Sequence, residues 1–247
     1  MSEADEWAAL AEFTSARVAL GRAGNALPTK RVLEFQLAHA RARDAVLAPF
    51  DADAVARSLA PRPCICVESQ APSREVYLVH PDLGRRLSDA SRPRLVRGVY
   101  DAALVVADGL SSTAIASHAA KLSAAIFDAL PMLAWAPVVI VGNGRVAIGD
   151  DVADALGAGL AIVMIGERPG LSAADSVGLY LTWDPRPGIT TDADRNCISN
   201  IRPGGLSFAD GAYRLAWLAT EARQRRVSGV NLKEDAPDTQ PDARLPG

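Results

Sequence analysis

Residues suited to chemistry stand in three short stretches of the second half of the chain: GNGRVAIGD at 142–150, IGERPGL at 165–171 and NCISNIRPGG at 196–205. Each stretch combines glycines, which let another group approach the backbone, with a few polar or charged side chains. None of them brings a histidine together with an acid or a nucleophile. The pattern is therefore more typical of ligand binding than of acid–base catalysis.

The first stretch follows the apolar run 138–141 and contains G-x-G-x-x-A, a pattern that holds a dinucleotide pyrophosphate at a strand–turn–helix junction. Glu167 ends the next apolar run, where such a fold places its ribose-binding acid. Asp150 and Asp151 argue against this interpretation, because two acids at the start of a helix repel an anion there. A nicotinamide or flavin domain therefore stays an alternative, as does a simple turn of the chain.

The other two stretches are open to more than one interpretation. Glu167 and Arg168 precede a Pro-Gly turn, which fits either a ligand contact or a surface ion pair. Cys197 lacks a histidine nearby in sequence, since none follows His118, so we expect a close ligand contact rather than a nucleophile. The three cysteines and three histidines have no metal-ligand spacing, and we predict neither a metal site nor a disulfide framework.

Apolar runs and helical patterns alternate from about residue 100. Strands are predicted at 102–107, 137–141, 160–165 and 176–183, and helices at 113–130, 150–156 and 208–226. Runs without polar alternation are typical of parallel strands that are covered on both faces. This order predicts an α/β fold with a Rossmann-like, doubly wound, mostly parallel sheet. Ligands bind beyond the carboxyl ends of such strands, so the loops after Ala107, Val141, Ile165 and Trp183 are candidate binding loops.

The first 95 residues are arginine-rich and mainly helical in pattern. A helix capped by Thr29 is predicted after Pro28, with Leu33 and Leu37 at helical spacing, and short strands are predicted at 64–67 and 76–79. We therefore divide the chain into a helical N-terminal region (1–95), a Rossmann-like domain (96–233) and a disordered, proline-containing tail (234–247).

Composition excludes several classes of protein. The chain has 247 residues, 49% of them apolar and 22% charged, which is ordinary for a globular protein. The net charge of −3 and the scattered arginines give no nucleic-acid surface. The N-terminus has no apolar signal region, and Asp128, Pro131 and Pro137 interrupt the most apolar stretch. We expect a cytoplasmic protein with no membrane or nucleic-acid partner.

The three stretches, in this order and at this spacing, resemble those of the small subunit (light chain) of ethanolamine ammonia-lyase. The likeness extends to ARVALGRAG at 16–24, PDLGRRL at 81–87, ADGLS at 107–111 and SGVN at 228–231. It covers residues 14 to 233 and is far more specific than a lone G-x-G.

This resemblance implies a lyase of hetero-oligomeric build. The small subunit would hold adenosylcobalamin against a large catalytic subunit, whose radical reaction converts ethanolamine to acetaldehyde and ammonia. Catalytic residues are expected on that partner and none on this chain. Because the chain has no D-x-H-x-x-G, the cofactor is expected base-on, with its own dimethylbenzimidazole below the cobalt.

The residues that match the family's cobalamin contacts are Val146, Glu167 and Cys197. The resemblance implies backbone contacts from Val146, hydrogen bonds accepted by Glu167, and a close contact from Cys197. Its expected neighbours are Arg145, Ser199 and Asn200. Some family members carry a long N-terminal extension for a bacterial microcompartment, whereas few residues precede Thr14 here, so that destination is an alternative to the cytoplasm. A dinucleotide oxidoreductase and a cofactor-free scaffolding module remain the rival functions.

Overall fold

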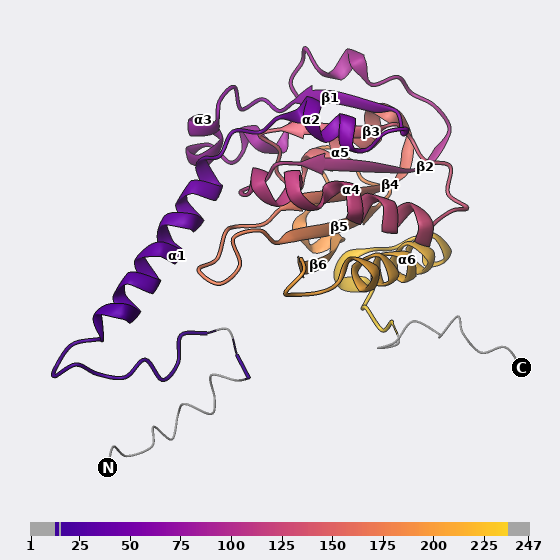
Figure 1. Cartoon of the computed structure of the whole chain (residues 1–247). Helices are drawn as coiled ribbons and strands as arrows, with labels where there is room; N and C mark the ends of the chain where they lie inside the picture. Colours follow the sequence, from indigo (N-terminus) through magenta and orange to yellow (C-terminus); the bar gives the residue numbers. More distant parts are fainter. Residues whose placement is uncertain (1–12, 15, 237–247) are drawn as a thin grey trace, which may run out of the picture.

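A computed structural model of the chain describes residues 13–14 and 16–236. Its centre is a six-stranded sheet in the order β1-β3-β2-β4-β5-β6 (Figure 1). The parallel strands are β1 (Cys64–Glu68), β3 (Val138–Gly142), β2 (Tyr100–Ala107) and β4 (Ala158–Gly166). Next to β4, the strands β5 (Val177–Trp183) and β6 (Arg195–Ile201) pair antiparallel. The predicted α/β class and mostly parallel sheet are confirmed.

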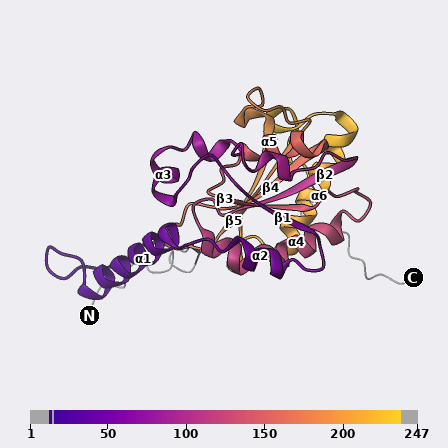
Figure 2. The same ribbon diagram turned by 90° about the horizontal axis from the view of Figure 1, so that it is seen from above.

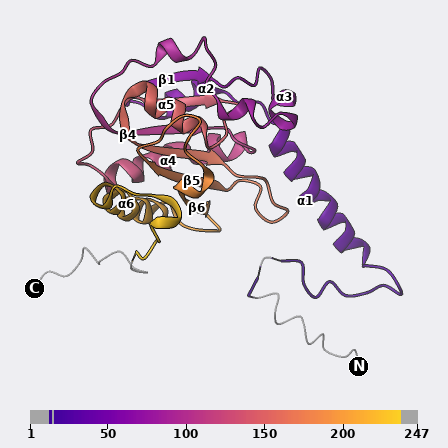
Figure 3. The ribbon, with the colours of Figure 1, turned by 180° about the vertical axis from the view of Figure 1, so that it is seen from behind.

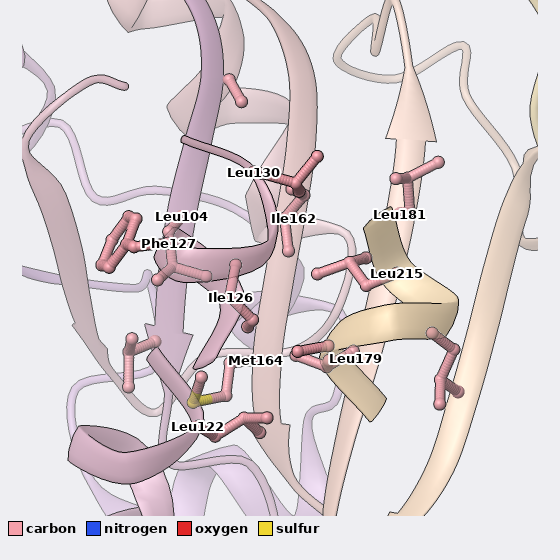
Figure 4. Close-up of a cluster of buried hydrophobic side chains, with 14 of the residues drawn as sticks. Leu104, Leu122, Ile126, Phe127, Leu130, Ile162, Met164, Leu179, Leu181 and Leu215 are labelled. Atoms are coloured by element: carbon pink, nitrogen blue, oxygen red, sulfur yellow. The ribbon is translucent and has the colours of Figure 1, made fainter. Parts of the chain in front are cut away.

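Helices pack on both faces of this sheet (Figures 1 and 2). One face is covered by α2 (Ala52–Ser58), α4 (Ser112–Ala129) and α6 (Phe208–Arg225). The other face packs α5 (Ile148–Leu156) over β2 and β4. Each face has its own apolar cluster, the first beneath α2, α4 and α6 and the second beneath α5. Adjacent residues of β2 point to opposite faces, so Leu104 lies in the first cluster and Val105 in the second. Figure 4 shows the first cluster, where Ile126 of α4 and Leu215 of α6 pack with Leu179 of β5.

The predicted strands and helices of the second half are confirmed, apart from β6, which the sequence analysis took for a loop. Its residues form a strand because they pair with β5, and they show little apolar alternation of their own. β1 comes from the first 95 residues and nevertheless pairs with β3, so the sheet draws on both predicted regions. The other short helical turns are η2 (Leu83–Arg85), η3 (Arg92–Arg94), η4 (Asp192–Asp194) and η5 (Gly229–Asn231).

Two local predictions for the N-terminal region are wrong. The segment predicted as a strand at 76–79 lies in the helix α3 (Arg74–Val79), because the Ser73 side chain caps it by accepting the Val76 N–H at 3.4 Å. Thr29 does not cap the first helix, whose N-cap position is taken by Pro28 without a side-chain hydrogen bond. Proline fixes a φ that suits the start of a helix and needs no cap of its own.

The helix α1 (Thr29–Leu47) is confirmed, and it projects from the body of the molecule (Figures 1 and 3). Only Ala42 and Ala45, near its end, are buried. Leu33 and Leu37 are 58% and 52% exposed. The apolar face read from the sequence therefore packs on nothing within the described part of the chain.

Residues 1–12, 15 and 237–247 lie outside the described residues, and with them most of the predicted tail. Within residues 13–14 and 16–236, no helix has both the length and the apolar character of a membrane span.

Candidate ligand-binding site

The three predicted site residues gather around one side chain, Tyr180 of β5. Glu167 follows β4 and lines a hollow of about 470 Å³ together with Val146, Tyr180 and Ser199 (the glutamate hollow). Cys197 lies in β6 and lines a second hollow of about 370 Å³, again with Val146 and Tyr180 (the cysteine hollow). Val146, Tyr180 and Arg145 form the wall that the two hollows share. Residues from three separate stretches thus meet at one place.

Strand alternation explains why these side chains share a face. In β5, Leu179 and Leu181 pack against the α4 and α6 side, so Tyr180 points to the opposite side. In β6, Ile198 does the same, which places Cys197 opposite Tyr180 in register. On this side α5 packs mainly over β2 and β4, and its first turn reaches β6 through the ion pair of Asp150 with Arg195. The result is a polar sheet face that remains open to a ligand.

Hydrogen bonds from other parts of the chain hold the loop after β3 in place. The Gly144 N–H donates to Asp108 Oδ1 at 3.1 Å, and the Arg145 N–H donates to the carbonyl of Gly84 at 2.7 Å. Ser69 Oγ donates to the carbonyl of Asn143, which has a left-handed φ of 55°. By contrast, the N–H groups of Val146 and the next residue find no hydrogen-bond acceptor in the described part of the chain. The loop therefore holds its free donors in a fixed position.

The side chain of Tyr77, with two arginines against its ring, supports this loop. Tyr77 is fully buried, and its hydroxyl donates to the carbonyl of Gly144 at 3.2 Å. The guanidinium groups of Arg74 and Arg145 lie 4.9 and 4.2 Å from the Tyr77 ring centroid. Arg74 also donates to Asp108 Oδ2 at 2.9 Å and to the carbonyl of Val46 at the end of α1. The projecting helix is thereby connected to the loop that carries Val146.

Glu167 is held by the backbone of β6. Both of its carboxylate oxygens accept the N–H of Asn200, at 3.3 and 3.2 Å. Asn200 has a left-handed φ of 59° and lies within the register shift between β5 and β6. Glu167 makes no ion pair with Arg168 or with any other described residue, so the surface ion pair considered from the sequence is absent from this part of the chain. The same side chain lines the glutamate hollow.

Cys197 is exposed, and its environment does not activate it. Although part of the side chain is exposed, the surrounding protein partly desolvates the sulfur and so raises the pKa of the Cys197 thiol above its ordinary value, while a hydrogen bond with Tyr180 opposes the rise. A thiol with a raised pKa stays protonated near neutral pH and is a poor nucleophile. His118 cannot act as its base, because it packs in α4 against Phe208, on the opposite side of the sheet.

Two ion pairs, one buried and one with a half-exposed arginine, hold the start of α5 beside the site. Arg195 of β6 donates to both carboxylate oxygens of Asp150 at 2.7 Å, and the two side chains are 3% and 4% exposed. Arg86 donates to Asp151 at 3.1 Å, and the same carboxylate accepts the Leu87 N–H. An arginine thus pairs with each of the two acids, so they do not repel an anion as unpaired charges would, which the sequence had suggested.

Tyr77, Tyr180 and Arg195 also belong to the site and were not predicted from the sequence. For Tyr180 a signal was present, since Tyr180 and Thr182 alternate with Leu179 and Leu181 and so predict one polar face. Tyr77 and Arg195 had no such signal. The site combines free N–H groups, the carboxylates of Glu167 and Asp192, a phenol and arginines. No group of His, Cys, Asp or Glu suited to a metal occurs among the described residues. This arrangement can bind and orient a ligand.

Comparisons with known proteins identify the family of this chain. The family model described as "Ethanolamine ammonia-lyase light chain" matches residues 4–233. A protein of Xanthomonas campestris pv. campestris named "Ethanolamine ammonia-lyase small subunit" is 51% identical over 243 residues, which cover 94% of this chain and 89% of the relative. Relatives with the same name in Azotobacter vinelandii and Pseudomonas aeruginosa are 49% and 48% identical, over 93% and 95% of this chain and 88% and 89% of their own lengths. The chain belongs to the ethanolamine ammonia-lyase light chain family.

Proposed function

We propose that this chain is the small subunit of an adenosylcobalamin-dependent ethanolamine ammonia-lyase and holds the base-on cofactor against a large catalytic subunit. The observation that carries the proposal is the meeting of Val146, Glu167 and Cys197 around Tyr180. These are the residues that the family resemblance selects as cobalamin contacts. They come from separate elements, and a shared ligand accounts for their convergence.

The chemistry of the site fits a corrinoid. The rim of a corrin ring carries amide side chains, which offer both N–H donors and carbonyl acceptors. Glu167 supplies a fixed acceptor, and the free N–H group of Val146 supplies a donor. The Arg145 Nε is buried and has no hydrogen-bond acceptor among the described residues, which leaves a further donor beside the shared wall. Neither hollow is lined by a histidine, which supports base-on binding.

In this proposal the residues of the chain bind and orient, and they transfer no proton. When bound, the cofactor supplies the cobalt–carbon bond whose homolysis starts the radical reaction. Tyr180 and Val146 exclude water from one side of the ligand, while Glu167 fixes its rotation through directional hydrogen bonds. The catalytic residues would then lie on the large subunit.

The projecting arm, residues 16–46, is the proposed contact with that large subunit. Its helix exposes Leu33 and Leu37, which lie on one face of the helix, on a segment with little core of its own. The arginines at 17, 22, 31, 41 and 43 add charge to the same arm. We further propose a Rossmann-like domain from 96 to 233 beside an N-terminal region of 1–95, and a location in the cytoplasm or in a bacterial microcompartment.

The test is reconstitution with the large subunit. The complex with adenosylcobalamin should show a cobalamin visible spectrum and release ammonia from ethanolamine, and the chain alone should release none. Val146→Trp would fill both hollows and should abolish retention of the corrinoid. Val99→Trp, at a position that is 96% exposed, is the matched control and should retain it. A nicotinamide or flavin spectrum, or no chromophore at all under cofactor excess, would overturn the proposal.

A further inference from the structure

The cysteine hollow is richer in arginine than the glutamate hollow, which Arg145 and Arg168 line beside Glu167. Its walls carry three arginines, Arg85, Arg145 and Arg195. The Arg195 side chain is 3% exposed, and its Nε has no hydrogen-bond acceptor among the described residues. A buried guanidinium with an unused donor beside a hollow is the usual mark of a site for a polar or anionic group.

The charges at this hollow do not cancel. Asp150 pairs with Arg195, and Asp192 at the rim lies 3.6 Å from Arg195 Nε and 4.0 Å from an Nη atom of Arg85. Three guanidinium groups therefore face two carboxylates, which leaves one positive charge. The free N–H groups of Val146 and Ala147 lie at the start of α5 and line the same hollow. Backbone donors at a helix start favour an anion.

We propose that the cysteine hollow is an anion subsite for the phosphodiester of the cofactor's nucleotide tail, with Arg85 and Arg145 as its ligands. The inference rests on the proposed cobalamin function and deepens it. The phosphodiester carries one negative charge, whereas the other polar groups of the corrinoid rim are neutral amides. One excess positive charge in the hollow matches that one negative charge.

The two hollows differ in the number of donors that they offer to an anion. Glu167 lines the glutamate hollow beside Arg145 and Arg168, and its carboxylate can accept amide donors. To the shared Arg145 the cysteine hollow adds Arg85, Arg195 and the free N–H groups of Val146 and Ala147. The cysteine hollow therefore offers more donors to a phosphate, which favours one orientation of the ligand.

The experiment compares two ligands that differ only in a phosphate. The complex with the large subunit is titrated with cobinamide, which lacks the nucleotide tail, and with cobinamide phosphate. The wild-type complex should prefer cobinamide phosphate by roughly ten- to a hundredfold, the range of a charge-assisted hydrogen bond. Arg85→Met and Arg145→Met should each reduce that preference to threefold or less (about 0.7 kcal/mol), and Arg85→Met should leave cobinamide affinity within a factor of about two.

Arg85→Met is the decisive variant, because its side chain is 56% exposed and its ion pair spans 4.0 Å, so its loss should not disturb folding. Arg97→Met is the matched control, since Arg97 is 68% exposed and pairs with Asp154, which does not line the hollow. A preference for cobinamide phosphate that survives Arg85→Met and Arg145→Met overturns the subsite. Wild-type binding of both ligands without preference also overturns the subsite alone, whereas no corrinoid binding at all overturns the proposed function as well.

Discussion

Removal of Arg195 should destabilise the chain strongly, because its guanidinium is the partner of a buried carboxylate. Arg195 holds both oxygens of Asp150 at 2.7 Å and bonds Thr182 Oγ1 at 3.1 Å. Both charged side chains are at most 4% exposed. Arg195→Met keeps the length of the side chain and removes the charge, so Asp150 stays buried without its counter-ion.

The expected magnitude follows from that burial. Loss of one member of a buried ion pair costs about 3–5 kcal/mol, mostly the cost of the charge that remains. Asp150→Asn alone should cost less than Arg195→Met, because the arginine keeps Thr182 and the nearby Asp192 as partners. The double variant should cost about 2 kcal/mol less than the sum of the single variants, since neither charge is then left alone.

The pH dependence gives a second, independent measure. Burial raises the pKa of Asp150, and the hydrogen bonds from Arg195 oppose that rise. Arg195→Met removes these hydrogen bonds and the positive charge, so the pKa of Asp150 should rise further. A folded-state pKa above the unfolded one means stability that is present at low pH and lost as the pH rises through the folded value. The variant should therefore be closer to wild type at pH 5 than at pH 8.

Urea unfolding of the wild type, the two single variants and the double variant at both pH values measures these quantities. Arg186→Met is the matched control, because its ion pair with Asp184 is 66% and 59% exposed and should contribute less than about 1 kcal/mol. Additive costs in the double variant would refute the reasoning, as would a cost for Arg195→Met no larger than the control. A cost that is the same at pH 5 and pH 8 would refute the assigned role of Asp150.

Three further outcomes follow from the site. In the assembled complex, Glu167→Gln should bind cobalamin nearly as well as wild type, whereas Glu167→Ala should bind roughly ten- to a hundredfold more weakly by titration; unchanged affinity in the Ala variant would remove Glu167 from the site. Burial raises the pKa of Asp108 to about 6 while Arg74 opposes the rise, so the stability from this group is full below about pH 4 and is lost as the pH rises through 6. Urea titrations from pH 4 to 7 should show that slope in the wild type and a flatter one in Asp108→Asn, and equal slopes would contradict the assignment. Deletion of residues 1–30 should reduce co-purification with the large subunit, and an undiminished complex would contradict the contact proposed for the arm.

The parallel half of the fold could be predicted because its strands are buried on both faces. Leu104 of β2 and Ile162 of β4 are fully buried, as are their sequence neighbours, and this leaves a continuous apolar run that identifies the strand. A local hydrogen bond explains why the segment at 76–79 is a helix and not the predicted strand. The valines near 76–79 favour a strand by propensity, yet the Ser73 cap starts a helix there.

The residues of the candidate site were found through the resemblance, and their surroundings were not predictable from the sequence. The bond from the Asn200 N–H to Glu167 depends on the register shift between β5 and β6, which pairing sets and composition does not. The contact between Tyr77 and Arg145 joins residues 68 positions apart. Such long-range contacts arise from packing, so only their polar or aromatic type is visible in the sequence.

The antiparallel pair β5 and β6 explains why the site lies where it does. A parallel sheet with helices on both faces has an open edge beyond its carboxyl ends, and Val146 and Glu167 occupy that edge. β5 and β6 then extend the sheet past α5, so the face that carries Tyr180 and Cys197 continues the edge as a polar surface without a helix over it. This face also holds the buried Nε of Arg195, which has no hydrogen-bond acceptor among the described residues. A buried donor without an acceptor lowers the stability of a chain on its own. A ligand and a second subunit that cover this face would remove that cost, and this is the physical reason to expect the chain to act within a complex.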